Sequence, residues 1–316
     1  MNKLQIKILE PQDFSLQAIE KLGLVGDVEC SSDISIERDS TEVLFIRLGY
    51  QLDKEFLKNY SSLRYIVSPT TGEDHVDKEY LSEKKISLLT LKGETEFLES
   101  IPATAEFTWG LLLSLTRNIK PACHSVIEGN WNRDLYKGHD SYGKTIALVG
   151  FGRVAKIIAR YAKAFGMHVK AFDPYVDEYP EGVEACESLA SLMTGADILS
   201  IHAALTPETT NLVGENELYL LPKHAVVINT SRGDILDARA LLDALRDNTI
   251  AGAAIDVIPG ERSTNNFIKN QLLAYAKQYN NLLVTPHLAG ASYESMAMTE
   301  EFMVDKLIKV MGKSSI

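Results

Sequence analysis

Short apolar runs alternate with longer amphipathic stretches along most of this chain. In the first hundred residues the runs of strand character are 4–9, 43–46, 63–67 and 86–89, with a weaker one near Val28. Stretches with helical periodicity separate them, at 14–22, 53–60 and 76–84. Alternation at this spacing predicts a small parallel α/β sheet that ends near residue 98.

The rest of the chain predicts a second, larger sheet. Residues 102–119 have the pattern of one long helix with Pro102 in its first turn. Six further apolar runs follow, at 146–149, 168–172, 198–201, 225–228, 250–255 and 282–284. We expect them to form a six-stranded doubly wound sheet over residues 99–288. A final helix is expected at 292–311, packed back on the first domain.

A dinucleotide-binding motif lies at the start of this second sheet. The run 146–149 leads into Gly150-Phe151-Gly152-Arg153-Val154-Ala155, a helical stretch and a second run that ends at Asp173. Gly150 permits a tight turn, Gly152 lets the backbone approach a pyrophosphate, and Ala155 lets helix and strand pack closely. Asp173 suits ribose hydroxyls and would repel a 2′-phosphate. Such a motif alone can be an ordinary glycine-rich turn, but this context predicts NAD as the cofactor.

Composition and charge narrow the class of protein. With 316 residues and 45% hydrophobic content, the chain can bury a substantial core and form two domains. The net charge of −11 disfavours nucleic acid and anionic membranes as main partners. Three scattered cysteines, Cys30, Cys123 and Cys186, show no metal-binding spacing and predict reduced thiols in a soluble cytoplasmic protein. No apolar stretch is long enough to span a bilayer.

Polar residues follow each apolar run of the second half, where parallel sheets bind their ligands. These residues are Asp173, His202, the segment from Asn229 to Arg232, Asp256 and the segment from Thr285 to His287. Arg232 offers a planar fork for a substrate carboxylate, and His287 can exchange a proton with a substrate oxygen. Glu261 is the acidic residue between Asp256 and His287 and could stabilise the charged imidazole. Each could instead be structural or surface-exposed, but their shared position favours a hydride-transfer enzyme.

These motifs together resemble the D-isomer-specific 2-hydroxyacid dehydrogenase family, in its phosphoglycerate dehydrogenase-like branch. The resemblance covers nearly the whole chain and includes 70–77, 103–106, the glycine motif with Asp173, 229–233, Asp256 with Glu261, and 285–290. It implies a flavodoxin-like substrate-binding domain built from residues 1–98 and 289–316, and an inserted NAD-binding Rossmann domain at 99–288. It also implies a homodimer.

By matching positions, the resemblance assigns roles to individual residues. Arg232, Glu261 and His287 would be catalytic, while Thr71 and Gly72 would bind the substrate carboxylate. The residues expected to line the cofactor are Thr104, Gly150, Gly152, Arg153, Val154, Asp173, His202, Thr230 and Asp256. Arg47 lies where phosphoglycerate dehydrogenases keep an arginine that contacts phosphate, although it could equally be a surface charge.

The resulting hypothesis is an NAD-dependent enzyme that interconverts a D-2-hydroxy acid and its 2-oxo acid. Substrates of the 3-phosphoglycerate, glycerate/hydroxypyruvate or glyoxylate class are expected. The alternative is an NAD(H)-binding sensor or a protein-binding module like the co-repressor relatives of the family, without significant turnover.

Overall fold

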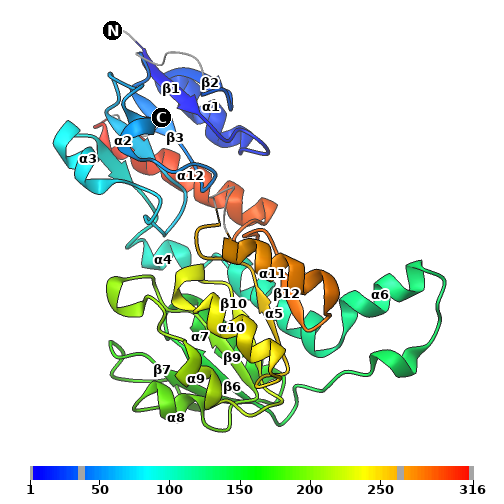
Figure 1. The fold of residues 1–316 in the computed structure, drawn as a ribbon. Helices are drawn as coiled ribbons and strands as arrows, with labels where there is room; N and C mark the ends of the chain where they lie inside the picture. Colours follow the sequence, from blue (N-terminus) through cyan, green and yellow to red (C-terminus); the bar gives the residue numbers. More distant parts are fainter. Residues whose placement is uncertain (1–2, 35–39, 262–266, 313–316) are drawn as a thin grey trace. The chain divides into compact units, whose positions relative to one another are not determined.

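The chain forms two compact units in the computed structural model, which describes residues 3–34, 40–261 and 267–312 (Figure 1). One unit combines Met1–Ile101 with Ala291–Ile316, and the other is Pro102–Gly290. These boundaries lie within three residues of those expected from the sequence.

Five parallel strands form the sheet of the first unit, in the order β2-β1-β3-β4-β5. The strands are β1 (Leu4–Ile8), β2 (Gly26–Cys30), β3 (Val43–Phe45), β4 (Tyr65–Val67) and β5 (Ser87–Leu89). The order 2-1-3-4-5 is that of flavodoxin-like folds and confirms the predicted fold class of this unit.

Helices from both ends of the chain complete the first unit. They are α1 (Leu16–Val25), α2 (Lys54–Leu57), α3 (Lys78–Lys84), α4 (Thr95–Leu98) and α12 (Tyr293–Val310). Met303, Val304 and Leu307 of α12 are completely buried in one hydrophobic cluster with Leu22 and Phe45. The C-terminal helix is therefore part of the core that the N-terminal segment builds.

The second unit has seven parallel strands in the order β12-β11-β10-β9-β6-β7-β8. They are β6 (Thr145–Val149), β7 (His168–Phe172), β8 (Val183–Ala185), β9 (Ile198–Ile201), β10 (Val226–Asn229), β11 (Gly252–Ile255) and β12 (Leu282–Val284). The order places the topological switch point of a Rossmann sheet between β6 and β9.

The prediction of six strands was wrong by one. The missed strand, β8, has three residues, and its Glu184 and Ala185 are exposed. It pairs with β7 alone at the edge of the sheet. Because an exposed edge strand buries little, it leaves no apolar run in the sequence.

Two helical layers cover this sheet. Alternate residues of β6 face opposite layers: Ala147 and Val149 pack in one hydrophobic cluster, Ile146 and Leu148 in the other. The helices are α5 (Ala103–Thr116), α7 (Arg153–Ala164), α8 (Leu189–Met193), α9 (Glu215–Tyr219), α10 (Ala238–Arg246) and α11 (Phe267–Gln278). Burial on both faces explains why β6, β9, β10 and β11 form largely apolar runs in the sequence.

The predicted single helix over 102–119 is in fact interrupted. Helix α5 ends at Thr116, and α6 (Ile119–Ile127) begins after Asn118, whose φ of +52° lies in the left-handed region. Asparagine tolerates this conformation better than most residues, so it can end one helix and redirect the chain. Helix α6 and the short 3₁₀ helix Arg133–Tyr136 project from the second unit (Figure 1). We call residues 118–139 the arm.

Within the described part of the chain, no helix is both long and apolar enough to cross a membrane.

Candidate functional site

The polar residues singled out in the second unit lie at the carboxyl edge of its sheet. Gly150 follows β6, Asp173 follows β7, His202 follows β9 and Asp256 follows β11. Parallel pairing aligns these strand ends, so the fold collects residues that are far apart in sequence along one edge.

The glycine motif provides space and backbone geometry for a dinucleotide. Gly150 has φ +82°, and a Cβ there would lie 2.8 Å from the backbone N and Cα of Ala203. Gly152 immediately precedes α7, where no side chain caps the helix, and a Cβ there would meet no atom within 4 Å. An open space before a helix N-terminus suits a pyrophosphate, because backbone N–H groups and the helix dipole attract anions. Arg153 and Val154 begin this helix and are half-buried.

Asp173 is held in place by the turn it faces. Its carboxylate accepts hydrogen bonds from the backbone N–H of Phe151 at 2.8 Å and of Tyr175 at 3.0 Å. Because a carboxylate can accept about four hydrogen bonds, capacity remains for two ribose hydroxyls. Its negative charge beside the glycine turn disfavours a 2′-phosphate.

His202 is kept neutral at the end of β9. Its Nε2 lies 2.8 Å from the hydroxyl of Ser200, and burial lowers the pKa of His202 to about 4. The imidazole is uncharged at neutral pH, so His202 contributes a neutral ring that can hydrogen-bond rather than a cation.

The end of β10 is tied to helix α5. The hydroxyls of buried Thr230 and Thr108 are 2.6 Å apart, and Thr108 donates to the backbone oxygen of Thr104 at 2.6 Å. The hydroxyl of Thr104 lies 4.0 Å from the position a Cβ on Gly290 would take. Thr104 and Thr230 therefore belong to one connected framework, although Thr108 had not been picked out from the sequence.

Buried Asp256 shapes the loop that carries His287. One carboxylate oxygen accepts from the Thr285 hydroxyl at 2.5 Å and from Leu288 N–H at 2.8 Å, and the other accepts from Ala289 N–H at 2.7 Å. The His287 N–H donates to the backbone oxygen of Asp256 at 2.9 Å. His287 itself has φ +57°, an uncommon conformation for histidine, and these bonds hold it there.

The side chains of His287 and Glu261 lie in contact, with the geometry of an ion pair. Nδ1 of His287 lies 2.5 Å from Oε1 of Glu261, and the two side chains are 21% and 26% exposed. The other oxygen of Glu261 accepts from Ile258 N–H at 3.3 Å. A carboxylate on Nδ1 fixes the ring orientation and stabilises the imidazolium, and it directs Nε2 away from Glu261 for proton exchange.

Arg232 lies on a loop that packs tightly against the Glu261 loop. Asn229 holds the loop by donating to the backbone oxygen of Arg232 at 3.0 Å and accepting from Ser231 N–H at 3.0 Å. A Cβ on the next residue, Gly233, would lie 2.2 Å from the carbonyl carbon of Ile258. Gly233 thus permits a backbone contact between the loops that carry Arg232 and Glu261. In the sequence, the glycine directly after Arg232 is a sign of a close backbone contact, but the sequence does not show that the contact is with Ile258.

The residues expected to bind substrate lie in the first unit. Thr71 and Gly72 follow β4 in a loop stabilised by Thr70, whose hydroxyl lies 2.9 Å from that of Ser68 and donates to the backbone oxygen of Gly72 at 3.1 Å. Arg47 follows β3 and forms an ion pair with Glu300, a buried residue of α12 that had not been picked out from the sequence.

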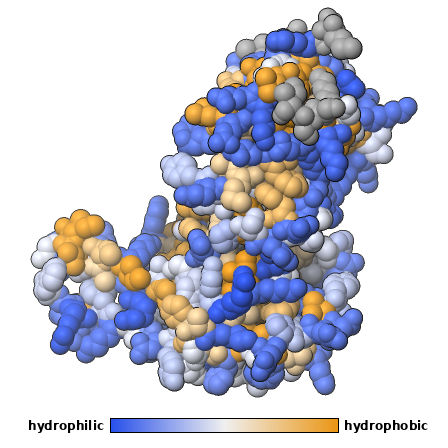
Figure 2. Space-filling model, turned by 180° about the vertical axis from the view of Figure 1, so that it is seen from behind, coloured by the Kyte–Doolittle hydropathy of each residue, from blue (hydrophilic) through white to orange (hydrophobic). Residues whose placement is uncertain are grey.

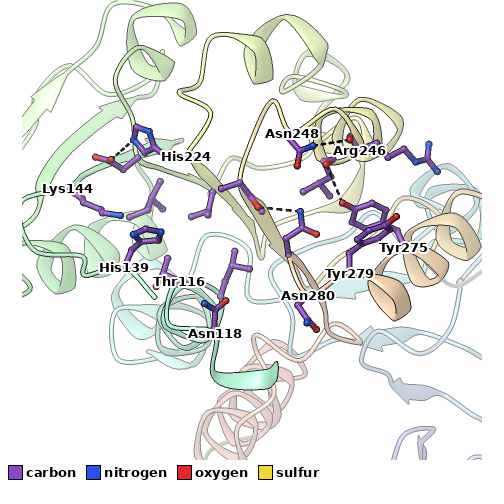
Figure 3. Close-up of a pocket in the computed structure, with 18 residues that line it drawn as sticks. Thr116, Asn118, His139, Lys144, His224, Arg246, Asn248, Tyr275, Tyr279 and Asn280 are labelled. Carbon is purple, nitrogen blue, oxygen red and sulfur yellow. Dashed lines mark hydrogen bonds and ion pairs between the residues drawn. The ribbon is translucent and has the colours of Figure 1, made fainter. Parts of the chain in front are cut away.

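The cavity drawn in Figure 3 lies at the opposite edge of the second sheet. It has a volume of about 720 Å³ and is lined by residues at the amino ends of the strands, including Lys144, Ile198, Val226 and Gly252. His224 and Asp197 also line it, and Nε2 of His224 lies 2.8 Å from a carboxylate oxygen of Asp197. The cavity is therefore separate from the residues of the glycine motif and the His287 pair.

The described residues contain no group of three or more histidine, cysteine or acidic side chains that could hold a metal ion. The Rossmann sheet, the open glycine turn and the His287–Glu261 pair define a dinucleotide-binding oxidoreductase of the dehydrogenase type.

Comparison with known proteins shows to which family of dehydrogenases the chain is similar. Residues 109–289 match the family model "D-isomer specific 2-hydroxyacid dehydrogenase, NAD binding domain". A D-3-phosphoglycerate dehydrogenase of Methanocaldococcus jannaschii is 31% identical over 314 residues, which are 97% of this chain and 57% of the relative. A glycerate dehydrogenase of Methylorubrum extorquens is 34% identical over 257 residues, 79% of this chain and 77% of the relative.

The solved structure of the TT0316 protein from Thermus thermophilus has the same fold. Its TM-score is 0.83 at 27% identity, and the match covers 98% of each chain. The chain belongs to the D-isomer-specific 2-hydroxyacid dehydrogenase family, and its cofactor is NAD. It spans 57% of the length of the phosphoglycerate dehydrogenase named above.

Proposed function

We propose that this protein is a cytoplasmic enzyme that interconverts a D-2-hydroxy acid and its 2-oxo acid with NAD. The observation that carries the proposal is the His287–Glu261 pair, with Nδ1 and Oε1 2.5 Å apart at the carboxyl edge of an NAD-binding sheet. Glycerate dehydrogenase and glyoxylate reductases among the relatives support a small 2-oxo acid as the substrate.

His287 is the acid–base catalyst in this proposal. In the oxidation direction, neutral His287 takes the proton of the C2 hydroxyl through Nε2, because Nδ1 is held by Glu261. Bound NAD would take the hydride from C2. In the reduction direction the protonated imidazole returns the proton to the oxygen that becomes the hydroxyl.

Arg232 and Glu261 assist this proton transfer. Glu261 stabilises the imidazolium as it forms, since a carboxylate in contact with the ring lowers the free energy of its cationic state. Arg232 binds the substrate carboxylate through its planar fork and orients C2. In the first unit, the backbone at Thr71 and Gly72 is proposed as a substrate-binding element.

The cofactor lies along the carboxyl edge of the second sheet in this proposal. Gly150, Gly152, Arg153 and Val154 would hold its pyrophosphate, and Asp173 its adenosine ribose. Toward the nicotinamide end we propose contacts with Thr104, His202, Thr230 and Asp256.

The test is consumption of NADH with glyoxylate, hydroxypyruvate, phosphohydroxypyruvate, pyruvate, 2-oxoglutarate and bulkier 2-oxo acids. We expect turnover with at least one, and a loss of about 10²–10⁴-fold in kcat in the His287→Ala variant. NADH binding, followed by fluorescence titration, should stay within about threefold, because the proton-transfer role lies outside cofactor binding. Turnover that survives in the variant would contradict the role of His287. NADH binding without turnover on the whole panel would favour the sensor alternative.

The arm supports the proposal of a homodimer. Its apolar side chains are unusually exposed, at 83% for Ile127, 89% for Trp131 and 69% for Leu135. Figure 2 shows hydrophobic residues gathered on this projecting segment. Exposed apolar groups of this number indicate a protein contact, and a second copy would supply an identical arm by two-fold symmetry. Light scattering of the purified protein would give the mass of a dimer, and a monomer at micromolar concentration would contradict the proposal.

A further inference from the structure

The guanidinium of Arg47 is already occupied within the first unit. Its Nε donates to Oε1 of Glu300 at 3.0 Å, its second terminal nitrogen pairs with the same oxygen, and the other terminal nitrogen donates to the backbone oxygen of Gln12 at 2.9 Å. The Arg47 side chain is only 16% exposed and that of Glu300 is 0% exposed. The guanidinium that could bind an oxyanion is therefore bound to a buried carboxylate instead.

Glu300 is anchored in turn. Its other oxygen accepts from Ser15 N–H at 2.7 Å, so both of its oxygens accept from donors that favour the carboxylate form. Burial raises the pKa of Glu300, while the Ser15 bond and Arg47 act against that rise. Separating Arg47 from a buried carboxylate would leave an uncompensated charge in the core, which is strongly unfavourable.

Two further carboxylates lie close to the Arg47–Glu300 pair. Glu10, which follows β1, accepts from Arg47 N–H at 2.6 Å and from Gly49 N–H at 3.0 Å. Glu301 accepts from the Ser15 hydroxyl at 2.6 Å. This hydrogen-bonded cluster therefore contains one guanidinium and three carboxylates, a formal charge of −2. A phosphate monoester, which carries about −1.5 to −2 at pH 7, would be repelled there.

We propose that Glu300 holds Arg47 as a structural ion pair and that the enzyme acts on an unphosphorylated D-2-hydroxy acid. The inference rests on the proposed function and narrows it. β3, which Arg47 follows, pairs with β4, which the Thr71–Gly72 loop follows. Arg47 and this loop therefore lie at the same carboxyl edge of the sheet, where Arg47 could contact a substrate phosphate. Its positive charge, however, is already neutralised by Glu300.

The first experiment compares kcat/KM of the wild-type protein for 3-phosphohydroxypyruvate with the best value among glyoxylate, hydroxypyruvate and pyruvate. We expect the unphosphorylated acid to be preferred at least tenfold. A smaller preference, or one for the phosphorylated acid, would overturn this inference and leave the dehydrogenase proposal standing. Absence of turnover with every acid would instead remove the proposed function on which the inference rests.

The second experiment removes the ion pair as a unit. The Arg47→Gln/Glu300→Gln double variant leaves no unpaired buried charge, so it has a better prospect of folding than either single variant. Thermal unfolding is measured alongside. If Arg47 is structural, the ratio of kcat/KM values for phosphohydroxypyruvate and hydroxypyruvate should change less than threefold. A tenfold fall confined to the phosphorylated acid would show that Arg47 binds phosphate and overturn the inference.

Discussion

The tight contact at Gly233 gives a direct test of how the site is assembled. In Gly233→Ala, the new Cβ would lie 2.2 Å from the Ile258 carbonyl carbon and 2.3 Å from Pro259 N. Ordinary contacts begin near 3.4 Å, so the two loops must separate by 3.4 − 2.2 = 1.2 Å. Since the obstructing atoms are backbone atoms, no side-chain rotation can relieve the overlap.

This displacement should affect both stability and turnover. Overpacking of this kind typically costs about 1–3 kcal/mol in the free energy of unfolding. For a unit of this size, each 1 kcal/mol lowers Tm by about 2–4 °C. A shift of about 1 Å in catalytic geometry can cost roughly 100-fold in rate. Because Arg232 lies next to Gly233 and Glu261 lies on the facing loop, we expect kcat/KM to fall about 100-fold.

The assay is steady-state NADH consumption with the best 2-oxo acid, with Tm measured by calorimetry. Gly23→Ala is the matched control, because a Cβ at Gly23 in α1 meets no atom within 4 Å. That substitution should stabilise the protein by about 0.5–1 kcal/mol and leave turnover unchanged. If Gly233→Ala keeps wild-type kcat/KM and Tm, the two loops are not held together by this contact.

Two further predictions concern charged and titrating groups. Glu261→Gln removes the negative charge beside Nδ1 of His287. Two unit charges whose centres are about 4 Å apart attract each other by about 4 kcal/mol at an effective dielectric constant of about 20. Partial exposure reduces this to about 2–3 kcal/mol, so kcat should fall roughly 30- to 150-fold, and a loss under threefold would refute the role. His202 has a pKa depressed from 6.5 to about 4, so its contribution to stability is present above pH 6.5 and is lost as pH falls to 4. The unfolding free energy, from urea titrations at each pH, should fall in this window by about 3 kcal/mol more than in His202→Gln. Parallel curves would show that the pKa of His202 is not lowered in the folded protein.

Much of the second unit could be predicted from the sequence. Strands buried on both faces are continuous apolar runs, so β6, β9, β10 and β11 were all anticipated. The edge strand β8 was missed because two of its three residues are exposed. The turn at Asn118 was also missed, because a left-handed residue leaves no mark in the apolar periodicity that continues on both sides.

The chemistry available to this protein follows from its amino-acid sequence alone. A strand, a glycine turn, a helix and Asp173 require only local geometry, and they indicate NAD without knowledge of the tertiary structure. The positions of His202, Asp256 and His287 at strand ends follow from the same local pattern, since the carboxyl end of each strand is visible in its sequence.

Which of these groups interact depends on how the chain packs in three dimensions. The 2.5 Å contact of His287 with Glu261, the clamp of Asp256 on the His287 loop and the close approach at Gly233 all join residues from different strand ends. The pairing of Arg47 with Glu300 joins residues 253 positions apart. A sequence shows that Arg47 is a cation at a strand end, but only the packing of α12 reveals that a buried carboxylate already holds it.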